Sequence, residues 1–293
     1  MNFGVSPATT TGTLLLLAPS SDTIPGSFND VNVDASRHHQ LMTQVQRLRG
    51  GVYLEDGAID HSQLSPDGRH VQAADERSWH IVSVEPDGTV TACARCLPHP
   101  RDVEPEDLGV WKCALADDPT WRQSLRAAVE HDIDTARRLN LSYVELGGWA
   151  VARVRRGTMH AFETAVSTYA LTAGLGGCLG ITTATVRHCS SLILRRLGGQ
   201  SLELAGLPLP SYFDPTYGCE MEILRFDSRA PNRRYSASIE RMGARFASIP
   251  VVAAPSPASD LLKPREKAPV LAALAERYLP PFMSAEFCAQ GVA

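Results

Sequence analysis

The chain has 293 residues, a length that allows one large domain or two small ones. Its 28 basic and 32 acidic residues leave a formal net charge of −4, so the overall charge gives no reason to expect binding to nucleic acid or to an anionic membrane. Its 7 cysteines are too scattered for a small disulfide-stabilised secreted domain, and we expect reduced thiols in a cytoplasmic protein.

Both ends of the chain differ in composition from its middle. Residues 1–35 are rich in Ser, Thr, Pro, Gly, Asn and Asp without an apolar period, which predicts an irregular segment. Within it, the apolar run TLLLLA at 13–18 is too short for a signal peptide or a membrane span. Residues 253–293 begin with a Pro/Ala/Ser-rich stretch typical of a linker, and a short helix is predicted at about 270–278. The folded domain is therefore predicted to be 36–252.

The first half of this domain predicts a helix, a hairpin and a second helix. Apolar residues at spacings of four and three predict a helix from Ser36 to about Arg49. Two apolar runs on either side of Pro-Asp-Gly at 86–88 predict a β-hairpin. A second helix over 119–139 is predicted because apolar residues recur at every fourth position from Trp121.

The second half alternates between strands and helices. In chain order, the patterns predict a strand 143–151, a turn 153–158, a helix 159–173, a strand 178–185, a helix 186–197, a strand 218–226, a helix 235–246 and a short segment 249–252. This alternation favours an α/β layer architecture, with helices packed on a mixed sheet.

The turn RVRRGT places three arginines at the start of a predicted helix. Unpaired N–H groups and the positive end of the helix dipole favour an oxyanion at such a place. Arg153, Arg155 and Arg156 add positive charge, and Gly157 allows the backbone to approach a ligand closely. These features predict a phosphate or pyrophosphate site. The alternative is a solvated basic turn that contains a glycine for its geometry.

Glu145 is a single carboxylate in an otherwise apolar strand, between Val144 and Leu146. If its side chain faces the interior, desolvation is expected to raise its pKa toward neutrality, which suits a general base. Side chains of a strand alternate, so Glu145 is on the opposite face from its two neighbours, and that face can instead be solvent. The strand pattern alone leaves both interpretations open.

Cys93, Cys96 and His99 have the spacing of some metal sites. A structural zinc site needs a fourth ligand and usually a tight turn at the first pair of ligands. This pair lies in a predicted strand, and only the isolated Cys113 follows it. We therefore predict no metal site.

A strand that ends in the arginine turn, followed by a helix, a strand and a helix ending in RRLGG, resembles the acyl-CoA-binding half of the GNAT superfamily of N-acetyltransferases. The turn keeps Arg153, Arg156 and Gly157 of the family pattern but lacks its last small residue. The resemblance implies a mixed, mostly antiparallel central sheet flanked by helices, in which a splayed strand pair forms the acyl-thioester cleft. Amides at the following helix start would hold the phosphate of the pantetheine arm.

The first half resembles more specifically the autoinducer-synthase branch of that superfamily, in the form seen in long-chain N-acyl amino acid synthases. Over about 40–252 it has an Arg-x-x-Val-aromatic element, a strand ending in Arg-x-Leu-Pro and a glutamate before the arginine turn. These residues are Arg49, Val52 and Tyr53; Arg95, Leu97 and Pro98; and Glu145. Gly148 stands where homoserine-lactone synthases place an arginine, which speaks against a homoserine-lactone product. Leu194 stands where many acetyltransferases have a tyrosine acid, so the proton donor to the leaving thiolate is unassigned.

The resemblance also implies roles for individual residues. Glu145 would be the general base, and the backbone of Trp149 to Val151 would align the thioester. The residues implied for the donor phosphate are Val151, Arg153, Arg155, Arg156, Gly157, Thr158 and Met159. Candidates for the acceptor side are Arg49, Tyr53, Trp79 and Arg95. Either of these two arginines can pair with an amino-acid carboxylate, or be a surface residue.

The implied function is transfer of a fatty acyl group, long-chain in this branch, to the amine of an amino acid or a related small molecule. The donor would be acyl carrier protein or acyl-CoA, with acyl-phosphopantetheine as co-substrate and no tightly bound cofactor. An acidic carrier protein as partner suits the basic turn. Two alternatives stay open: a short-chain acetyl-CoA-dependent N-acetyltransferase, and a catalytically silent domain that binds acyl thioesters.

Overall fold

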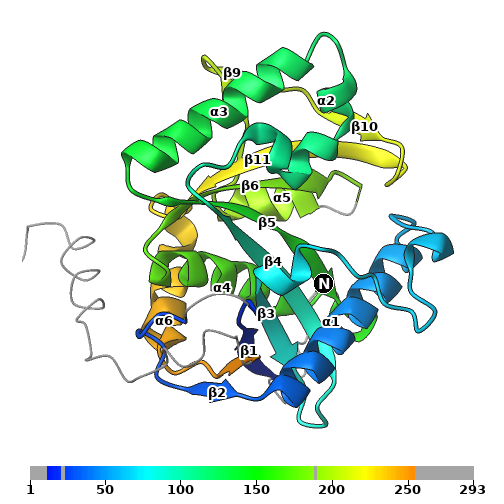
Figure 1. The fold of residues 1–293 in the computed structure, drawn as a ribbon, viewed down its shortest axis with the longest axis vertical. Helices are drawn as coiled ribbons and strands as arrows, with labels where there is room; N and C mark the ends of the chain where they lie inside the picture. Colours follow the sequence, from blue (N-terminus) through cyan, green and yellow to red (C-terminus); the bar gives the residue numbers. More distant parts are fainter. Residues whose placement is uncertain (1–11, 21–23, 188–189, 255–293) are drawn as a thin grey trace, which may run out of the picture.

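The computed structural model describes residues 12–20, 24–187 and 190–254, in which one large sheet carries helices on both faces (Figure 1). Its strands are β1 Thr13–Leu17, β2 Val31–Val33, β3 Trp79–Val84, β4 Val90–His99, β5 Ser142–Val151, β6 Cys178–Thr185, β7 Gln200–Ser201, β10 Tyr212–Asp214, β11 Cys219–Asp227 and β12 Val251–Ala253. A separate pair consists of β8 Glu203–Leu204 and β9 Leu207–Pro208. The helices are α1 Ala35–Glu55, α2 Ala114–Asp117, α3 Arg122–Arg138, α4 His160–Gly174, α5 Ser190–Leu197 and α6 Ser236–Phe246.

The strand order of the large sheet is β10-β11-β6-β5-β4-β3-β1-β12-β2, with β7 also paired to β11. Neighbours are antiparallel except for β5 with β6, β1 with β12 and β12 with β2. The predicted α/β class with a mixed, mostly antiparallel sheet is therefore confirmed. The predicted hairpin is confirmed as well, because β3 and β4 pair from Trp79↔Cys96 to Val84↔Val90.

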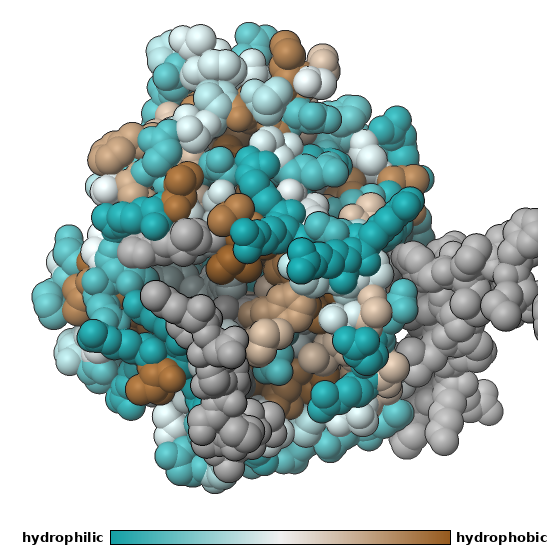
Figure 2. Space-filling model, turned by 180° about the vertical axis from the view of Figure 1, so that it is seen from behind, coloured by the Kyte–Doolittle hydropathy of each residue, from teal (hydrophilic) through white to brown (hydrophobic). Residues whose placement is uncertain are grey.

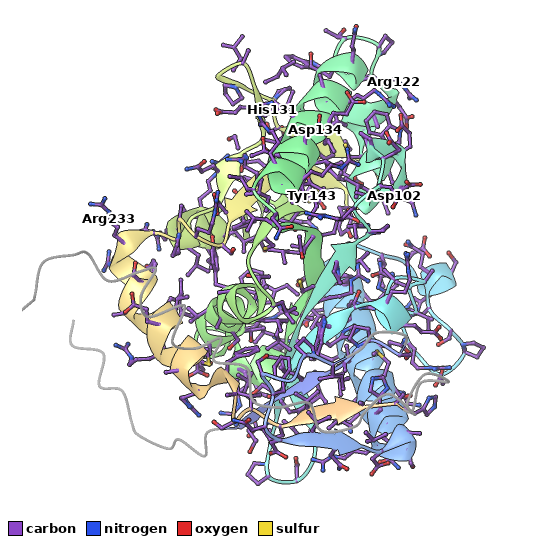
Figure 3. The ribbon with its side chains drawn as sticks, turned by 60° about the vertical axis from the view of Figure 1, so that its left-hand side comes forward. Asp102, Arg122, His131, Asp134, Tyr143 and Arg233 are labelled. Atoms are coloured by element: carbon purple, nitrogen blue, oxygen red, sulfur yellow. The ribbon has the colours of Figure 1, made fainter. Side chains whose placement is uncertain are left out.

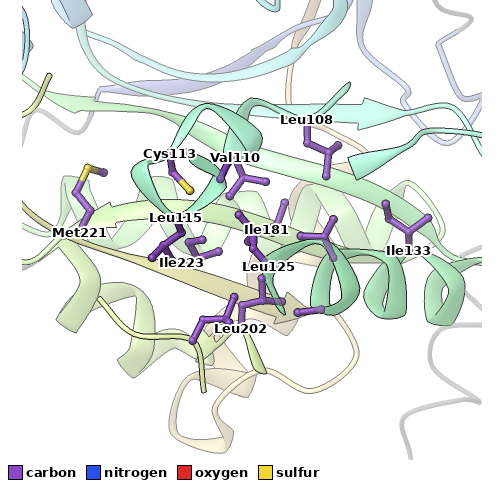
Figure 4. Packing of buried hydrophobic residues seen from close by; sticks show 14 of the residues in the cluster. Leu108, Val110, Cys113, Leu115, Leu125, Ile133, Ile181, Leu202, Met221 and Ile223 are labelled. Carbon is purple, nitrogen blue, oxygen red and sulfur yellow. The ribbon is translucent and has the colours of Figure 1, made fainter. Parts of the chain in front are cut away.

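Alternation along β5 divides the core into two layers. Tyr143 faces α3 and packs in a cluster with Leu125 and Val129 of that helix. Figure 4 shows part of this cluster, including Leu125 and Ile133 of the helix. Val144 faces the other way and packs in a cluster with Leu171 of α4. Figure 2 shows the molecule from behind, where apolar residues gather near the middle of a largely polar surface. No helix among the described residues is both long and apolar enough to cross a bilayer.

The second predicted helix is confirmed as α3. Leu125, Val129 and Ile133 are at most 2% exposed, as their four-residue spacing predicts. Figure 3 shows Tyr143 at the start of β5, beneath the same helix. Arg137 and Arg138 lie in the last turn, where positive charge is favourable beside the helix dipole.

The prediction of an irregular N-terminal segment is wrong for the residues that form β1. This strand pairs with β3 on one side and with β12 on the other, and Leu16 and Leu17 are fully buried. A strand buried on both faces shows no apolar alternation, and its partners are distant in the sequence. The predicted linker and C-terminal helix after Ala253 lie outside the described residues.

The first helix is longer than predicted at both ends. Asp34, not Ser36, is the N-cap, and its side chain accepts a hydrogen bond from the backbone N–H of Arg37 at 2.9 Å. The helix continues through Gly50, where a Cβ would lie 2.8 Å from the carbonyl oxygen of Gly68. This glycine serves close packing and does not end the helix. The extension carries Glu55, the last residue of α1, to the arginine turn.

Candidate active site

β5 and β6 run side by side only at their beginnings. These parallel strands pair from Ser142↔Cys178 to Glu145↔Ile181, and no pairing between them continues beyond this point in the described chain. β5 goes on paired with β4, and β6 goes on paired with β11. The strands therefore part as predicted, and Glu145 lies at the fork.

A glycine shapes β5 just beyond the fork. Gly148 has a φ of +61°, and it lies at an irregularity in the pairing of β5 with β4. A Cβ at this position would lie 3.0 Å from Cβ of Arg95 and 3.4 Å from Nη1 of Arg49. An arginine at position 148 would therefore require a different backbone and a different arrangement of these two arginines.

The carboxylate of Glu145 has three hydrogen-bond partners. The backbone N–H groups of Gly109 and Val110, in the 3-10 turn Gly109–Lys112, donate to Oε2 at 2.9 Å and to Oε1 at 3.0 Å. His99 Nε2 lies 3.0 Å from Oε2. Burial by itself raises the pKa of Glu145, but the hydrogen bonds and the attraction of His99 outweigh it, so this pKa lies below its usual value. The expectation of a pKa near neutrality is wrong, because it considered desolvation without these donors.

His99 is a site residue that the sequence patterns did not identify as a partner of Glu145. Strand pairing brings the two together, because His99 lies opposite Tyr143 and Leu97 lies opposite Glu145. His99 and Glu145 are thus diagonal neighbours on one face of an antiparallel pair. The available signal was the Arg-x-Leu-Pro strand end, which His99 follows directly.

The two cysteines near His99 do not form a metal site with it. Cys93 packs in the layer under α1, whereas Cys96 packs in the layer under α4. They therefore point to opposite faces of β4. In the part of the chain that the structure describes, no group of three His, Cys, Asp or Glu side chains is placed to hold a metal ion. Burial raises the pKa of the Cys93 thiol to about 11.

Arg49 and Arg95 share one buried carboxylate, that of Asp75. Arg49 donates from Nη1 to Oδ1 at 2.9 Å and from Nη2 to Oδ2 at 2.7 Å, and its side chain is fully buried. Arg95 Nη1 lies 3.2 Å from Oδ1, and its side chain is 15% exposed. Burial raises the pKa of Asp75, but the hydrogen bonds and charge of Arg49 outweigh it and hold this pKa well below its usual range. Of the two predicted acceptor-side arginines, only Arg95 keeps exposed surface. The sequence patterns did not identify Asp75.

The two aromatic residues predicted for the acceptor side lie in different places. Tyr53 is half-buried and packs against His70, with ring centroids 5.6 Å apart. Trp79 is 3% exposed and stacks on Phe28 with centroids 5.3 Å apart, in the core layer under α4. The structure therefore places Trp79 on the face of the sheet opposite to Arg95, as alternation along the paired strands requires. This corrects the prediction of Trp79 as an acceptor-side residue.

Arg155 forms a two-point ion pair with Glu85, directly after β3. Its Nε and Nη2 donate to the two carboxylate oxygens of Glu85 at 2.9 Å and 2.5 Å, and its side chain is 22% exposed. Glu85 also accepts a hydrogen bond from the hydroxyl of Thr91 at 3.0 Å. This two-point ion pair fixes the turn beside the hairpin of β3 and β4.

Arg153 and Arg156 lie against the C-terminal end of α1. Arg153 is 83% exposed and pairs with Glu55 at 3.2 Å. Arg156 pairs with Glu55 at 3.4 Å and with Asp56 at 3.3 Å. The arginines predicted to bind phosphate are therefore close together, and carboxylates of α1 face them.

Helix α4 begins directly after the arginine turn. Gly157 has a φ of +75°, and a Cβ there would meet nothing within 4 Å, so the conformation of the turn is what favours glycine. The Thr158 hydroxyl donates to the carbonyl oxygen of Arg155 at 2.6 Å, and Met159 is 59% exposed. The N-cap residue Met159 provides no capping side-chain hydrogen bond. A bound oxyanion would meet the positive end of the helix dipole here.

Trp149 and Val151 belong to the part of β5 beyond the fork. Val151 pairs with Ala92 of β4. Trp149 packs in the layer under α4, and its buried Nε1 has no hydrogen-bond partner among the described residues. The edge of this half of β5 that faces β6 has no strand partner in the described chain.

Two cavities lie beside the large sheet. One of about 430 Å³ is bordered by β1, β3, α4 and α6, and one of about 230 Å³ lies beside His99 and Tyr143 near the end of α3. Leu146 lies against the paired part of the two strands, because its Cδ1 would lie 3.5 Å from a Cβ placed at Gly180 of β6, which pairs with Val144.

No protein-family model matches the sequence, and no curated protein matches it. Among solved structures, the chain is similar to a CoA-dependent acyl-homoserine lactone synthase, BjaI, with SAM and isopentyl-CoA. The identity is 14% over 90% of this chain and 99% of that one, with a TM-score of 0.49. It is similar to FeeM, an N-acyl amino acid synthase from uncultured soil microbes, at 10% identity over 68% and 88% of the chains, with a TM-score of 0.42. A putative N-acetyltransferase from Lactobacillus plantarum is 10% identical over 73% and 98%, with a TM-score of 0.40.

Proposed function

We propose that this protein is an N-acyltransferase that moves an acyl group from a phosphopantetheine thioester to the amine of an amino acid or a related small molecule. The supporting observation is the continuous path along β5, from the carboxylate of Glu145 at the fork, along an unpaired strand edge, to the arginine turn. An extended arm with amide groups can add to such an edge as a strand does. From Glu145 to Val151 this edge spans about 20 Å, which suits an extended arm.

Glu145 would accept a proton during the attack of the amine on the thioester. A carboxylate with a lowered pKa is too weak to deprotonate a free ammonium group, so the amine must arrive neutral. After attack, the nitrogen of the tetrahedral adduct is positively charged and acidic, and a weak base suffices. The carboxylate has about four lone-pair positions, of which three are occupied by its present partners, so one can face the amine. Of the backbone N–H groups from Trp149 to Val151, those that point to the unpaired edge of β5 would hold the oxyanion.

Arg95 would bind the carboxylate of an amino-acid acceptor. Arg49 is completely buried and bound at two points to Asp75, which leaves it no surface for a substrate. Arg95 shares Asp75 through one Nη only, keeps exposed surface, and has a buried Nε without a partner among the described residues. It lies opposite Gly147 on β5, two residues from Glu145 on the same face.

The donor would present its phosphate to Arg153, Arg156 and the start of α4. Val154 is 83% exposed within the same turn, so this surface combines positive charge with apolar contact area. An acidic acyl carrier protein suits such a surface, and acyl-CoA is the alternative donor. A long acyl chain is what the sequence resemblance implies.

A catalytically silent thioester-binding domain is the second candidate. It is favoured by the three hydrogen-bond partners of Glu145 and by Leu194, which stands where a tyrosine acid would be expected. The two candidates differ in whether any amide forms. In the deciding experiment, the full-length protein is incubated with a mixture of amines and one of three donors. The donors are acylated acyl carrier protein, long-chain acyl-CoA and acetyl-CoA, and new amides are detected by mass spectrometry. An amide supports the transferase, amide formation from acetyl-CoA alone supports short-chain transfer, and donor binding without any amide supports the silent domain.

Replacing Arg95 by methionine is expected to raise KM for the amino-acid acceptor roughly 10- to 100-fold, because a charge-assisted hydrogen bond is lost. The affinity for the donor should not change. Steady-state kinetics with the amino acid and with its carboxamide would measure this, since the carboxamide should be nearly insensitive to the substitution. Arg101→Met is the control, because Arg101 is exposed and bonded to Asn140. Equal losses for both acceptors would contradict the assignment.

A further inference from the structure

The C-terminal end of α1 touches the segments that follow both parted strands. On the β5 side, Glu55 and Asp56 pair with Arg153 and Arg156 at 3.2 to 3.4 Å. On the β6 side, Arg187 donates from Nη2 to the backbone carbonyl oxygen of Asp56 at 2.5 Å. The end of one helix thus spans the open side of the strand fork.

These contacts are of a kind that exchanges easily. The side chains of Glu55, Arg153 and Arg156 are 40%, 83% and 38% exposed, and that of Asp56 is 22% exposed. Their charged atoms lie 3.2 to 3.4 Å apart, farther than in the Arg155–Glu85 pair. Exposed ion pairs contribute little to stability and are weakened by salt. By contrast, the Arg155–Glu85 pair is largely buried and joined at two points, so it would stay in place. The turn is therefore held by one firm pair, while its other two guanidinium groups are held loosely.

We propose that Glu55 and Asp56 are a carboxylate gate over the donor-phosphate site. Without donor they occupy Arg153 and Arg156. The phosphate of the arriving arm takes these guanidinium groups and releases the end of α1. A phosphate offers more acceptor oxygens to two guanidinium groups than an exposed carboxylate does, and the helix start of α4 favours it further. This inference rests on the proposed function, and it makes Glu55 and Asp56 specificity-determining residues for a phosphorylated donor.

The gate predicts an effect on ligand binding that a basic turn without facing carboxylates would not produce. Removing both carboxylates should strengthen binding of any ligand whose phosphate reaches Arg153 and Arg156. It should leave a ligand without phosphate unaffected, because such a ligand never competes with Glu55 and Asp56. The gain should shrink at high salt, where the exposed pairs are already weakened.

The test is titration calorimetry of the full chain with 4′-phosphopantetheine and with pantetheine, at low and high salt. We expect the double variant Glu55→Gln/Asp56→Asn to bind 4′-phosphopantetheine roughly 3- to 10-fold more tightly than the parent protein. Its affinity for pantetheine should be unchanged. The control is Asp67→Asn, which removes another exposed carboxylate paired with arginines, and it should change neither affinity. An Arg153→Ala/Arg156→Ala variant should distinguish the two ligands much less than the parent protein does, because only the start of α4 then favours the phosphate.

Tighter binding of both ligands, or weaker binding of the phosphorylated one by the carboxylate variant, would overturn the gate. The same holds if the arginine variant distinguishes the two ligands as strongly as the parent protein does. Amide formation is measured separately. If no donor and amine yield an amide while the expected affinities are found, the proposed function fails and the gate stands. If amides form and the affinities do not change, the gate fails and the function stands.

Discussion

In a Glu145→Gln variant, amide formation is expected to fall roughly 100- to 10,000-fold, with binding of the thioester donor retained. The glutamine keeps the size of the side chain but cannot take a proton from the tetrahedral adduct. Single-turnover measurements with saturating donor would show the loss in the chemical step. The control is Glu222→Gln, which alters a partly buried carboxylate bound to Ser191 and Arg195. An unchanged rate in Glu145→Gln would end the assignment of Glu145 as the base.

The pH dependence of the same step tests the environment of Glu145. Because its pKa is lowered, the carboxylate stays ionised as the pH falls through the usual glutamate range, and activity is lost only at lower pH. Replacing His99 by leucine removes one contribution that lowers this pKa, so the loss should begin at higher pH. The rates should be measured with an acceptor amine of low pKa, which stays neutral over this pH range. The loss of activity in acid then reports on Glu145 and not on protonation of the acceptor. A control is His38→Gln, since His38 is buried and its Nε2 lies 3.0 Å from the carbonyl oxygen of Ala18. An identical acid limb in the parent protein and in His99→Leu would show that His99 does not tune Glu145.

Asp75→Asn is expected to lower the free energy of unfolding by about 3 to 5 kcal/mol. The substitution leaves the fully buried guanidinium group of Arg49 without its counter-charge, and Arg95 loses the same partner. Denaturant unfolding at neutral pH would measure the loss through the midpoint at unchanged slope. Asp67→Asn is again the control, because its ion pairs are exposed and should contribute little.

Asp75 should also make the free energy of unfolding decrease as the pH is lowered. Its folded-state pKa lies well below the unfolded value, so its contribution is fully present above the unfolded pKa. The contribution is lost as the pH falls through the folded pKa. The parent protein should therefore lose stability in acid more steeply than Asp75→Asn does. If the stability of both proteins fell equally with decreasing pH, Asp75 would not be the source of the acid dependence.

Local sequence patterns predicted the helices and strands whose bounds do not depend on contacts with distant residues. The strand Cys178–Thr185 agrees with its predicted range, and the buried positions of α3 follow its four-residue period. Boundaries were less reliable where tertiary contacts decide them. The first helix was predicted to end at about Arg49, yet it continues through Gly50, which packs closely against Gly68, to Glu55.

The amino-acid sequence by itself determined the layered α/β class, the position of Glu145 within a strand and the arginine-rich start of a helix. Periodicity and glycine placement are local properties, so they can be read without knowing the partners. Only the tertiary structure decided the charge state and freedom of these groups. Strand pairing brings His99 to Glu145, and the 3-10 turn donates two backbone N–H groups to the same carboxylate. Asp75 holds Arg49 in a fully buried ion pair, and the end of α1 faces the arginine turn. A pKa or an ion pair depends on atoms a few ångströms away, and those atoms come from residues far apart in the chain.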